Sequence, residues 1–403
     1  MAFNWENPYL TARTPVFARN VVSTSHPLAA QAGNRVLLEG GNAVDAAIAT
    51  AATLTIVEPV SNGLGSDAFA LVWAEGQLHG LNASGPAPAA WDLNYFRRRY
   101  GENASGHANR PERGWDSVTV PGAIAGWDAL HRRFGKLPFS RLMQSALEIA
   151  DRGVTIAPMV AKKWRAAVPI LAQQPGFADA FMPNGRAPEV GEAFRFSAAA
   201  KTLGILADQG ARAFYEGELA EHIVKWAQKT GGNLTLEDLR RYQPEWVTPV
   251  SQSYRGYEVH EIPPNGQGIA ALIALGILEN FDLASLPLDG VDSQHLQIEA
   301  MKLAFADVYR YVADPTSMEV TPEQMLNPTY LRQRAAQIDL SRASLPAAGI
   351  PRSGGTVYLI TADESGMRVS FIQSNYMGLG SGGVVPEYGS SLQNRGAGCS
   401  SDT

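Results

Sequence analysis

Apolar residues recur along the chain in helical and in alternating patterns. Helical patterns cover Pro27–Gly40 and Ala43–Val57, and the second of these is rich in small residues, begins after the cap residue Asn42 and is expected to pack closely in the interior. Alternating patterns at Ala68–Trp73 and Gln77–Leu81 predict a hairpin. Because two helices precede these strands, the pattern favours a sheet layered against helices over a wound βαβ arrangement.

The rest of the chain continues this mixture. Strands are predicted at Ser117–Gly122 and Tyr254–Glu261, and Ser341–Gly355, with its prolines and glycines, is predicted to be an exposed loop. An abrupt β pattern follows at Thr356–Thr361 and returns at Met367–Ser374 after a turn. Helices are predicted at Ala123–Phe134, Phe139–Arg152, Ile269–Asn280 and Ser293–Val312.

Composition narrows the class of protein. The 403 residues are 45% hydrophobic and 18% charged, which is typical of a large folded interior, and the net charge of −6 gives no support to a nucleic-acid partner. The single cysteine, Cys399, excludes a disulfide within the chain, and no two histidines have the i, i+4 spacing of a helical metal site. Without a basic and apolar leader pattern or a span-length apolar run, we expect a cytoplasmic protein with no membrane partner.

The candidate chemistry lies where the last β pattern begins. Gly355 directly precedes Thr356, and a cut between them would give Thr356 a free α-amino group that titrates near pH ~8. That amine can accept the hydroxyl proton of its own residue, so nucleophile and base would be one residue. Glycine before the cut tolerates the strained backbone that attack on its carbonyl requires. Taken alone, the same residues also fit a simple loop entering a sheet.

The surrounding chain, from about residue 22 to 398, resembles the γ-glutamyltransferase (γ-glutamyl transpeptidase) family of N-terminal-nucleophile (Ntn) hydrolases. Any one matching segment is a common string, but their order along the chain is specific. The segments are His26–Ala29, Gly40–Ala47, Glu58-Pro59 with Gly63–Ser66, Val120–Gly122, Phe134–Pro138, Ala146–Ala150, Thr235–Leu239, Pro263–Gly268, the positions from His295 through Glu299 and Lys302 to Pro315, Thr356, and Gly380–Gly382.

The resemblance implies an α+β fold, the four-layer αββα sandwich, and a proenzyme that cuts itself at Gly355–Thr356. Residues 1–355 would form the large-subunit region and 356–403 the start of the small subunit, together one Ntn-hydrolase domain. Thr356 would then attack a small-molecule amide and pass the acyl group to water or an amine, as in glutathione metabolism, with no cofactor and no metal. Homo-oligomerisation stays open. Asn42, Asp45, His131 and His295 are expected to make local structural hydrogen bonds.

Several positions depart from the family pattern and bear on the substrate. The resemblance implies nucleophile support from Ser374, which keeps the hydroxyl of the usual Thr, and from Asn375, while Tyr376 takes the usual Asn position. Ser84 stands where an Arg would grip an α-carboxylate, and Arg395 stands where a Gln would bind an amine. Both are candidate substrate-binding residues.

These departures favour hydrolysis of a small or acyl amide, as in the acylase-like and oxamate-amidohydrolase-like branch, over γ-glutamyl transfer. Arg395 has an alternative interpretation as a salt-bridge partner at a domain joint. The small subunits of the family also continue well beyond the length of 356–403, with further strands and a Gly-Gly oxyanion hole. We therefore expect a C-terminally short chain, and a truncated, inactive relative remains the competing hypothesis.

Overall fold

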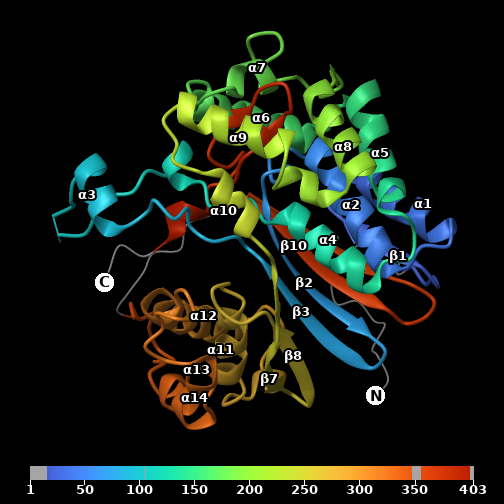
Figure 1. The fold of residues 1–403 in the computed structure, drawn as a ribbon. Coiled ribbons are helices and arrows are strands. Elements are labelled where there is room, and N and C mark those ends of the chain that lie inside the picture. Colours follow the sequence, from blue (N-terminus) through green and yellow to red (C-terminus); the bar gives the residue numbers. More distant parts are fainter. Residues whose placement is uncertain (1–15, 105, 347–354, 400–403) are drawn as a thin grey trace.

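The computed structural model of the chain describes residues 16–104, 106–346 and 355–399. A six-stranded sheet lies at its centre (Figure 1). The strand order is β1-β9-β10-β2-β3-β6, and each neighbouring pair is antiparallel. The strands are β1 (Val21–Thr24), β2 (Asp67–Ala74), β3 (Gln77–Ala83), β6 (Glu245–Val247), β9 (Gly355–Ala362) and β10 (Arg368–Tyr376). The predicted hairpins β2–β3 and β9–β10 are confirmed, and the described strands of this sheet, all antiparallel to their neighbours, form no wound βαβ unit.

A layer of helices covers one face of this sheet. Its centre is α2 (Ala43–Val57), of which every residue is buried. Asn42 caps α2 with the carboxylate of Asp45 in a reciprocal capping box, and Asp45 also accepts the amides of Lys136 and Leu137, so the expected structural role of these two residues is confirmed. The other helices on this side are α1 (Pro27–Leu38), α4 (Ala123–Phe134), α5 (Phe139–Arg152), α6 (Pro158–Leu171), α7 (Phe177–Phe181), α8 (Ser197–Gln209), α9 (Glu218–Lys229) and α10 (Leu236–Arg241), while α3 (Leu93–Tyr100) lies to one side.

A second group of elements lies on the other side of the sheet (Figure 1). It has an apolar core of its own and comprises the hairpin β7 (Val250–Tyr254) and β8 (Tyr257–Glu261) with helices α11 (Ile269–Leu278), α12 (Val291–Tyr311), α13 (Pro322–Met325) and α14 (Pro328–Ala335). Ile262 after β8 and Gly266 face the sheet at Gly80 and Phe69. Helices, six-stranded sheet, hairpin and helices thus follow one another as layers, which gives the α+β class predicted.

The sheet face opposite α2 is where the candidate nucleophile lies. Along β9, Val357 and Leu359 are buried toward the helices, whereas Thr356, Tyr358 and Ile360 alternate onto the opposite, exposed face. β1 and β10 flank β9 on its two sides. A cut before Thr356 would therefore leave β9 hydrogen-bonded within the sheet.

Two predicted strands are wrong. Residues 118–122 follow a short 3-10 turn and are extended, but their amides bond to separate carbonyls, as Val120 to Pro86 and Gly122 to Ser66, and not to one partner strand. The predicted strand Tyr254–Glu261 is the end of β7, a turn and β8, because Arg255 and Gly256 both adopt a positive φ and reverse the chain.

Candidate functional site

Thr356 occupies the second position of β9, directly opposite Ser374 of β10. Its Oγ1 lies 2.9 Å from the Ser374 Oγ, and the Ser374 Oγ also accepts the backbone N–H of Tyr376 at 2.8 Å. Residues opposite one another in an antiparallel pair project from the same face, so the register itself brings the two hydroxyls together. The structure thus places Ser374 in direct contact with the candidate nucleophile.

Asn375 is the extra residue of a β-bulge in β10, where the pairing register shifts between Ser374 and Tyr376. Its side-chain oxygen accepts a hydrogen bond from Ser66 at 2.8 Å, and its backbone N–H donates to Ser61. Tyr376 follows with a φ of 73°, a conformation that costs a non-glycine residue energy. Asn375 therefore fastens the 61–66 loop through Ser66 and Ser61.

Arg395 forms an ion pair with Asp67. The Nη2 of Arg395 donates to Oδ1 of Asp67 at 3.0 Å, and its Nε donates to the other carboxylate oxygen. Asp67 is only 1% exposed and lies opposite Ser374 in the β10–β2 register, whereas the Arg395 side chain remains 31% exposed. The guanidinium also lies 4.8 Å from the centroid of the Tyr376 ring. Of the two interpretations of Arg395, the salt bridge is the one the geometry shows, although it lies inside the site and not at a domain joint.

Ser84 lies one residue beyond the Ala68–Ala83 pair, which places it beside Asp67. It is buried, and its hydroxyl accepts the amide of Asn265 at 3.1 Å. Asn265 in turn accepts a hydrogen bond from Asn82. Thr356, Ser374 and Asp67 thus form a row across three adjacent strands. Ser84, just past the end of β3, continues this row, and Asn265 lies at its end. The Pro263–Gly268 motif was prominent in the sequence, but its asparagine was not recognised as a site residue.

A buried amide network lies beneath this row, on the helix side of the sheet. Gln373, adjacent to Ser374, is fully buried, accepts the indole N–H of Trp127 at 3.0 Å and donates to Asn62 at 2.9 Å. Asn62 donates onward to the carbonyls of Leu54 and Glu58. Hydrogen-bonded networks of this kind fix strand position. The sequence alone gave no signal for it, because the partners are hundreds of positions apart.

The histidines singled out in the sequence make local contacts, as expected. His131 contacts the carbonyl of Leu137 through Nε2 at 2.7 Å, and His295 contacts that of Asp339 at 2.9 Å. In the described part of the chain, no three His, Cys, Asp or Glu side chains lie together as metal ligands. None of the helices at the described positions combines the length and apolarity needed to cross a membrane.

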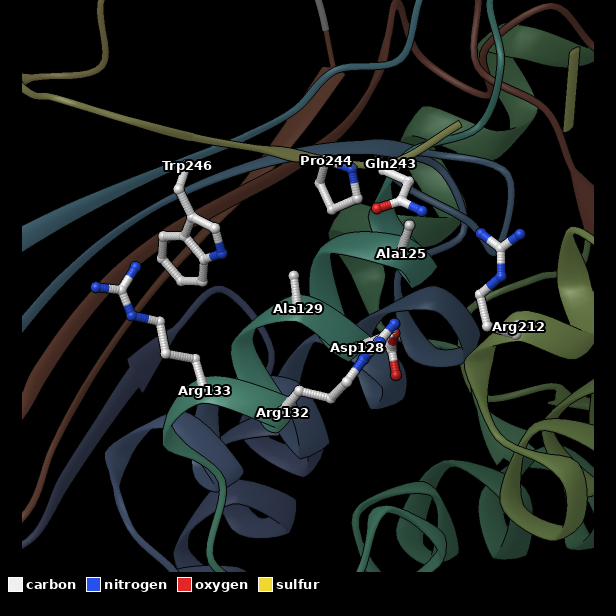
Figure 2. A pocket seen from close by; sticks show the side chains of 9 residues that line it. All are labelled: Ala125, Asp128, Ala129, Arg132, Arg133, Arg212, Gln243, Pro244 and Trp246. Atoms are coloured by element: carbon white, nitrogen blue, oxygen red, sulfur yellow. Dashed lines mark hydrogen bonds and ion pairs between the residues drawn. The ribbon is translucent and has the colours of Figure 1, made fainter. Parts of the chain in front are cut away.

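A cavity of about 310 Å³ lies at the other edge of the sheet, between α4, β6 and the segment around Arg212 (Figure 2). Arg132 and Arg212 on its wall pair with Asp128 and Glu216, and Arg133 lies 4.3 Å from the centroid of the Trp246 ring. β6 is four strand spacings from β9, which at ~4.8 Å each puts it roughly 19 Å from Thr356. This cavity is therefore separate from the candidate nucleophile Thr356.

The layered α+β fold, with a threonine at the start of a central strand, is that of an Ntn hydrolase. The profile of the family described as Gamma-glutamyltranspeptidase matches residues 29–403, and the chain belongs to this enzyme family. A glutathione hydrolase-like proenzyme of Bacillus subtilis is 36% identical over 388 residues, covering 96% of this chain and 72% of that protein.

Two further relatives carry other activities in their names. An oxamate amidohydrolase proenzyme of Klebsiella pneumoniae is 35% identical over 386 residues, which cover 94% of this chain and 71% of that protein. The crystal structure of a cephalosporin acylase from Bacillus halodurans superposes with a TM-score of 0.89 at 46% identity, covering 100% of this chain and 74% of that one. The resemblance to the γ-glutamyltransferase family is confirmed, and it includes relatives from the acylase-like and oxamate-amidohydrolase-like branch.

Proposed function

We propose that the chain is a proenzyme that cuts itself between Gly355 and Thr356 and then hydrolyses an amide through Thr356. The observation that carries this proposal is the place of Thr356: near the start of β9, on the exposed sheet face, with its Oγ1 2.9 Å from the Ser374 hydroxyl. The proenzymes among its relatives support the same order of events.

In the first step, Thr356 Oγ attacks the carbonyl carbon of Gly355. The C–N bond breaks as the C–O bond forms, which leaves an ester and a free Thr356 amine. Water then hydrolyses the ester and releases the Gly355 carboxylate. The products are residues 1–355 as large subunit and a small subunit that begins at Thr356.

The second reaction uses the new amine as the base. It takes the proton from Thr356 Oγ while Oγ attacks the substrate amide carbon, and the departing amine of the substrate receives that proton. The acyl group stays on Oγ as an ester until water attacks and restores the hydroxyl. Ser374 is the positioning residue for Oγ1, since its own hydroxyl is held by the Tyr376 amide. Asn375 supports this strand end by holding Ser66.

We further propose that the substrate is a small amide or acyl amide without a free γ-glutamyl head group. Ser84 is neutral and buried, and the Arg395 guanidinium already faces the Asp67 carboxylate. At Ser84, such a site has no charged side chain that could bind an α-carboxylate through two hydrogen bonds. Arg395 can donate to a substrate carboxylate only with those N–H groups that are not already bonded to Asp67. The similarity to an oxamate amidohydrolase and to a cephalosporin acylase points the same way.

The test is a comparison of kcat/KM for three amides: oxamate, a glutaryl amide and γ-glutamyl-p-nitroanilide. We expect the kcat/KM of one of the first two to exceed that of the γ-glutamyl substrate by about 10²-fold, which corresponds to one lost hydrogen bond of about 2.7 kcal/mol to the charged head group. Thr356→Ala should abolish turnover of all three. Equal or better turnover of the γ-glutamyl substrate would contradict the substrate proposal, and no Thr356-dependent turnover would favour the inactive-relative hypothesis.

A further inference from the structure

The cavity beside β6 has small side chains on one wall and a tryptophan on another (Figure 2). Ala125 and Ala129 are four residues apart and therefore lie on one face of α4. Pro244, just before β6, and Trp246, within it, also line the cavity. Its volume of about 310 Å³ is at the small end of ligand sites, which span roughly 300–1,000 Å³. The cavity is therefore of a size to hold a small molecule with an apolar body.

The charges that line this cavity are mainly positive. Its charged lining residues are Arg132, Arg133, Arg212 and Asp128. This local excess of positive charge stands against a net charge of −6 for the whole chain. Arg132 is balanced by an ion pair with Asp128, and Arg212 is balanced by an ion pair with Glu216. A concave surface lined by charge of one sign attracts ligands of the opposite sign, here anions.

Arg133 differs from the other two arginines, because no carboxylate pairs with it in the described part of the chain. Its Nη2 donates to Nδ1 of His79 at 2.9 Å, and its guanidinium lies 4.3 Å from the centroid of the Trp246 ring and 5.1 Å from that of Phe134. His79 supplies no negative charge, and burial and the Arg133 charge both lower the pKa of its imidazole. The ring contacts hold the guanidinium in place, while the described contacts use only one of its five N–H donors. The remaining donors are available to an anion.

We propose that this cavity is a binding site for a small aromatic carboxylate, separate from Thr356. Arg133 donates to the carboxylate, since a guanidinium binds a carboxylate through two parallel hydrogen bonds. The aromatic ring of the ligand packs against Trp246 and the alanines of α4, where ring contacts and apolar burial both favour it. Inorganic phosphate would match the charge of Arg133 but would leave the apolar lining uncovered. The inference does not depend on self-cleavage or on the proposed amide hydrolysis.

The experiment titrates 4-fluorobenzoate into the whole chain carrying Thr356→Ala and follows binding by fluorine NMR. We expect saturable binding to one site with a Kd of about 1 mM, as is typical of a ligand with about ten non-hydrogen atoms. Arg133→Gln should weaken binding at least about tenfold, because it removes the charge that faces the carboxylate. Ala129→Leu keeps all three arginines but fills the cavity, and it should weaken binding at least about tenfold as well. The matched control is Arg310→Gln, which removes an exposed arginine that pairs with Glu319 in α12's half of the molecule and should leave the Kd unchanged.

Two further probes test the class of ligand. The neutral 4-fluorobenzyl alcohol should bind at least about tenfold more weakly than 4-fluorobenzoate, and inorganic phosphate should displace 4-fluorobenzoate only at higher concentrations than benzoate does. An alcohol that binds equally tightly, or a phosphate that displaces the probe more readily than benzoate, would overturn the proposed ligand class. The site itself would be overturned if no saturable binding occurred up to roughly 20 mM, or if neither Arg133→Gln nor Ala129→Leu weakened it. All of these outcomes leave the proposed function of Thr356 untouched.

Discussion

Replacing Arg395 with methionine tests whether the guanidinium serves the fold or the substrate. The substitution keeps the apolar stem and removes the charge that faces Asp67, which is 1% exposed. Removing one partner of a buried ion pair costs about 3–5 kcal/mol, because the other charge stays buried without compensation. Because the Arg395 side chain is 31% exposed, solvent screens part of the ion pair, and we expect Arg395→Met to lower the free energy of unfolding by about 3 kcal/mol, the low end of that range.

The assay is urea unfolding in a Thr356→Ala background, which keeps every protein in one piece. Arg395→Met, Asp67→Asn and the double variant complete a cycle. We expect the double variant to be destabilised by less than the sum of the single changes, by up to about 3 kcal/mol, since it leaves no orphan charge. The structural role of the ion pair would be refuted if Arg395→Met lowered the free energy of unfolding by less than ~1 kcal/mol and the effects of the two single changes added up in the double variant. If Arg395→Met, made in the enzyme that keeps Thr356, instead raised KM about tenfold, which corresponds to ~1.4 kcal/mol, Arg395 would be a substrate-binding residue.

Three further outcomes are expected. Asp45→Ala should lower the free energy of unfolding by about 3 kcal/mol in urea titrations, because it removes a buried cap that accepts three backbone amides; a cost under ~1 kcal/mol would contradict the capping account. Ser374→Ala should slow both maturation and turnover by about tenfold, because it removes one hydrogen bond of ~1.4 kcal/mol to Thr356 Oγ1. Ser374→Thr should restore both rates. Unchanged rates in Ser374→Ala would exclude Ser374 as a positioning residue. Burial raises the pKa of Glu299, but hydrogen bonds from Lys302 and Ser344 outweigh burial and hold that pKa below its ordinary value of 4.5. The stability gained from the Glu299 charge is therefore fully present above pH 4.5, and it is lost as the pH falls through the lowered pKa. The difference in urea midpoint between wild type and Glu299→Gln should accordingly stay constant from pH ~7 to ~5 and shrink in stronger acid.

Local sequence signals predicted much of the fold. α2 was predicted at its observed bounds, because small apolar residues follow an Asn cap and every one of them is buried. The β9–β10 hairpin was equally predictable, since a turn rich in polar residues separates two segments in which apolar and polar residues alternate. That hairpin alone sets Thr356 opposite Ser374, so the central contact of the candidate site followed from local pairing.

The rest of the site depends on contacts between distant segments. Asp67 meets Arg395 across 328 positions of sequence, and Asn265 reaches Ser84 across 181. A single sequence carries no record of such pairings, so the sequence leaves both interpretations of Arg395 open, and only its contact with Asp67 distinguishes them. The strand expected before Pro121 failed for a related reason: its residues have β-propensity, but tertiary contacts gave them no partner strand.

The most direct test of the account is the intact mass of the purified protein beside its Thr356→Ala variant. We predict that the wild type separates into two chains, one ending at Gly355 and one beginning at Thr356, while the variant remains one species at the 43.2 kDa of the whole chain. A wild type that also persists at 43.2 kDa, or that is cut at another bond, would contradict the assignment of Thr356 as the self-processing nucleophile.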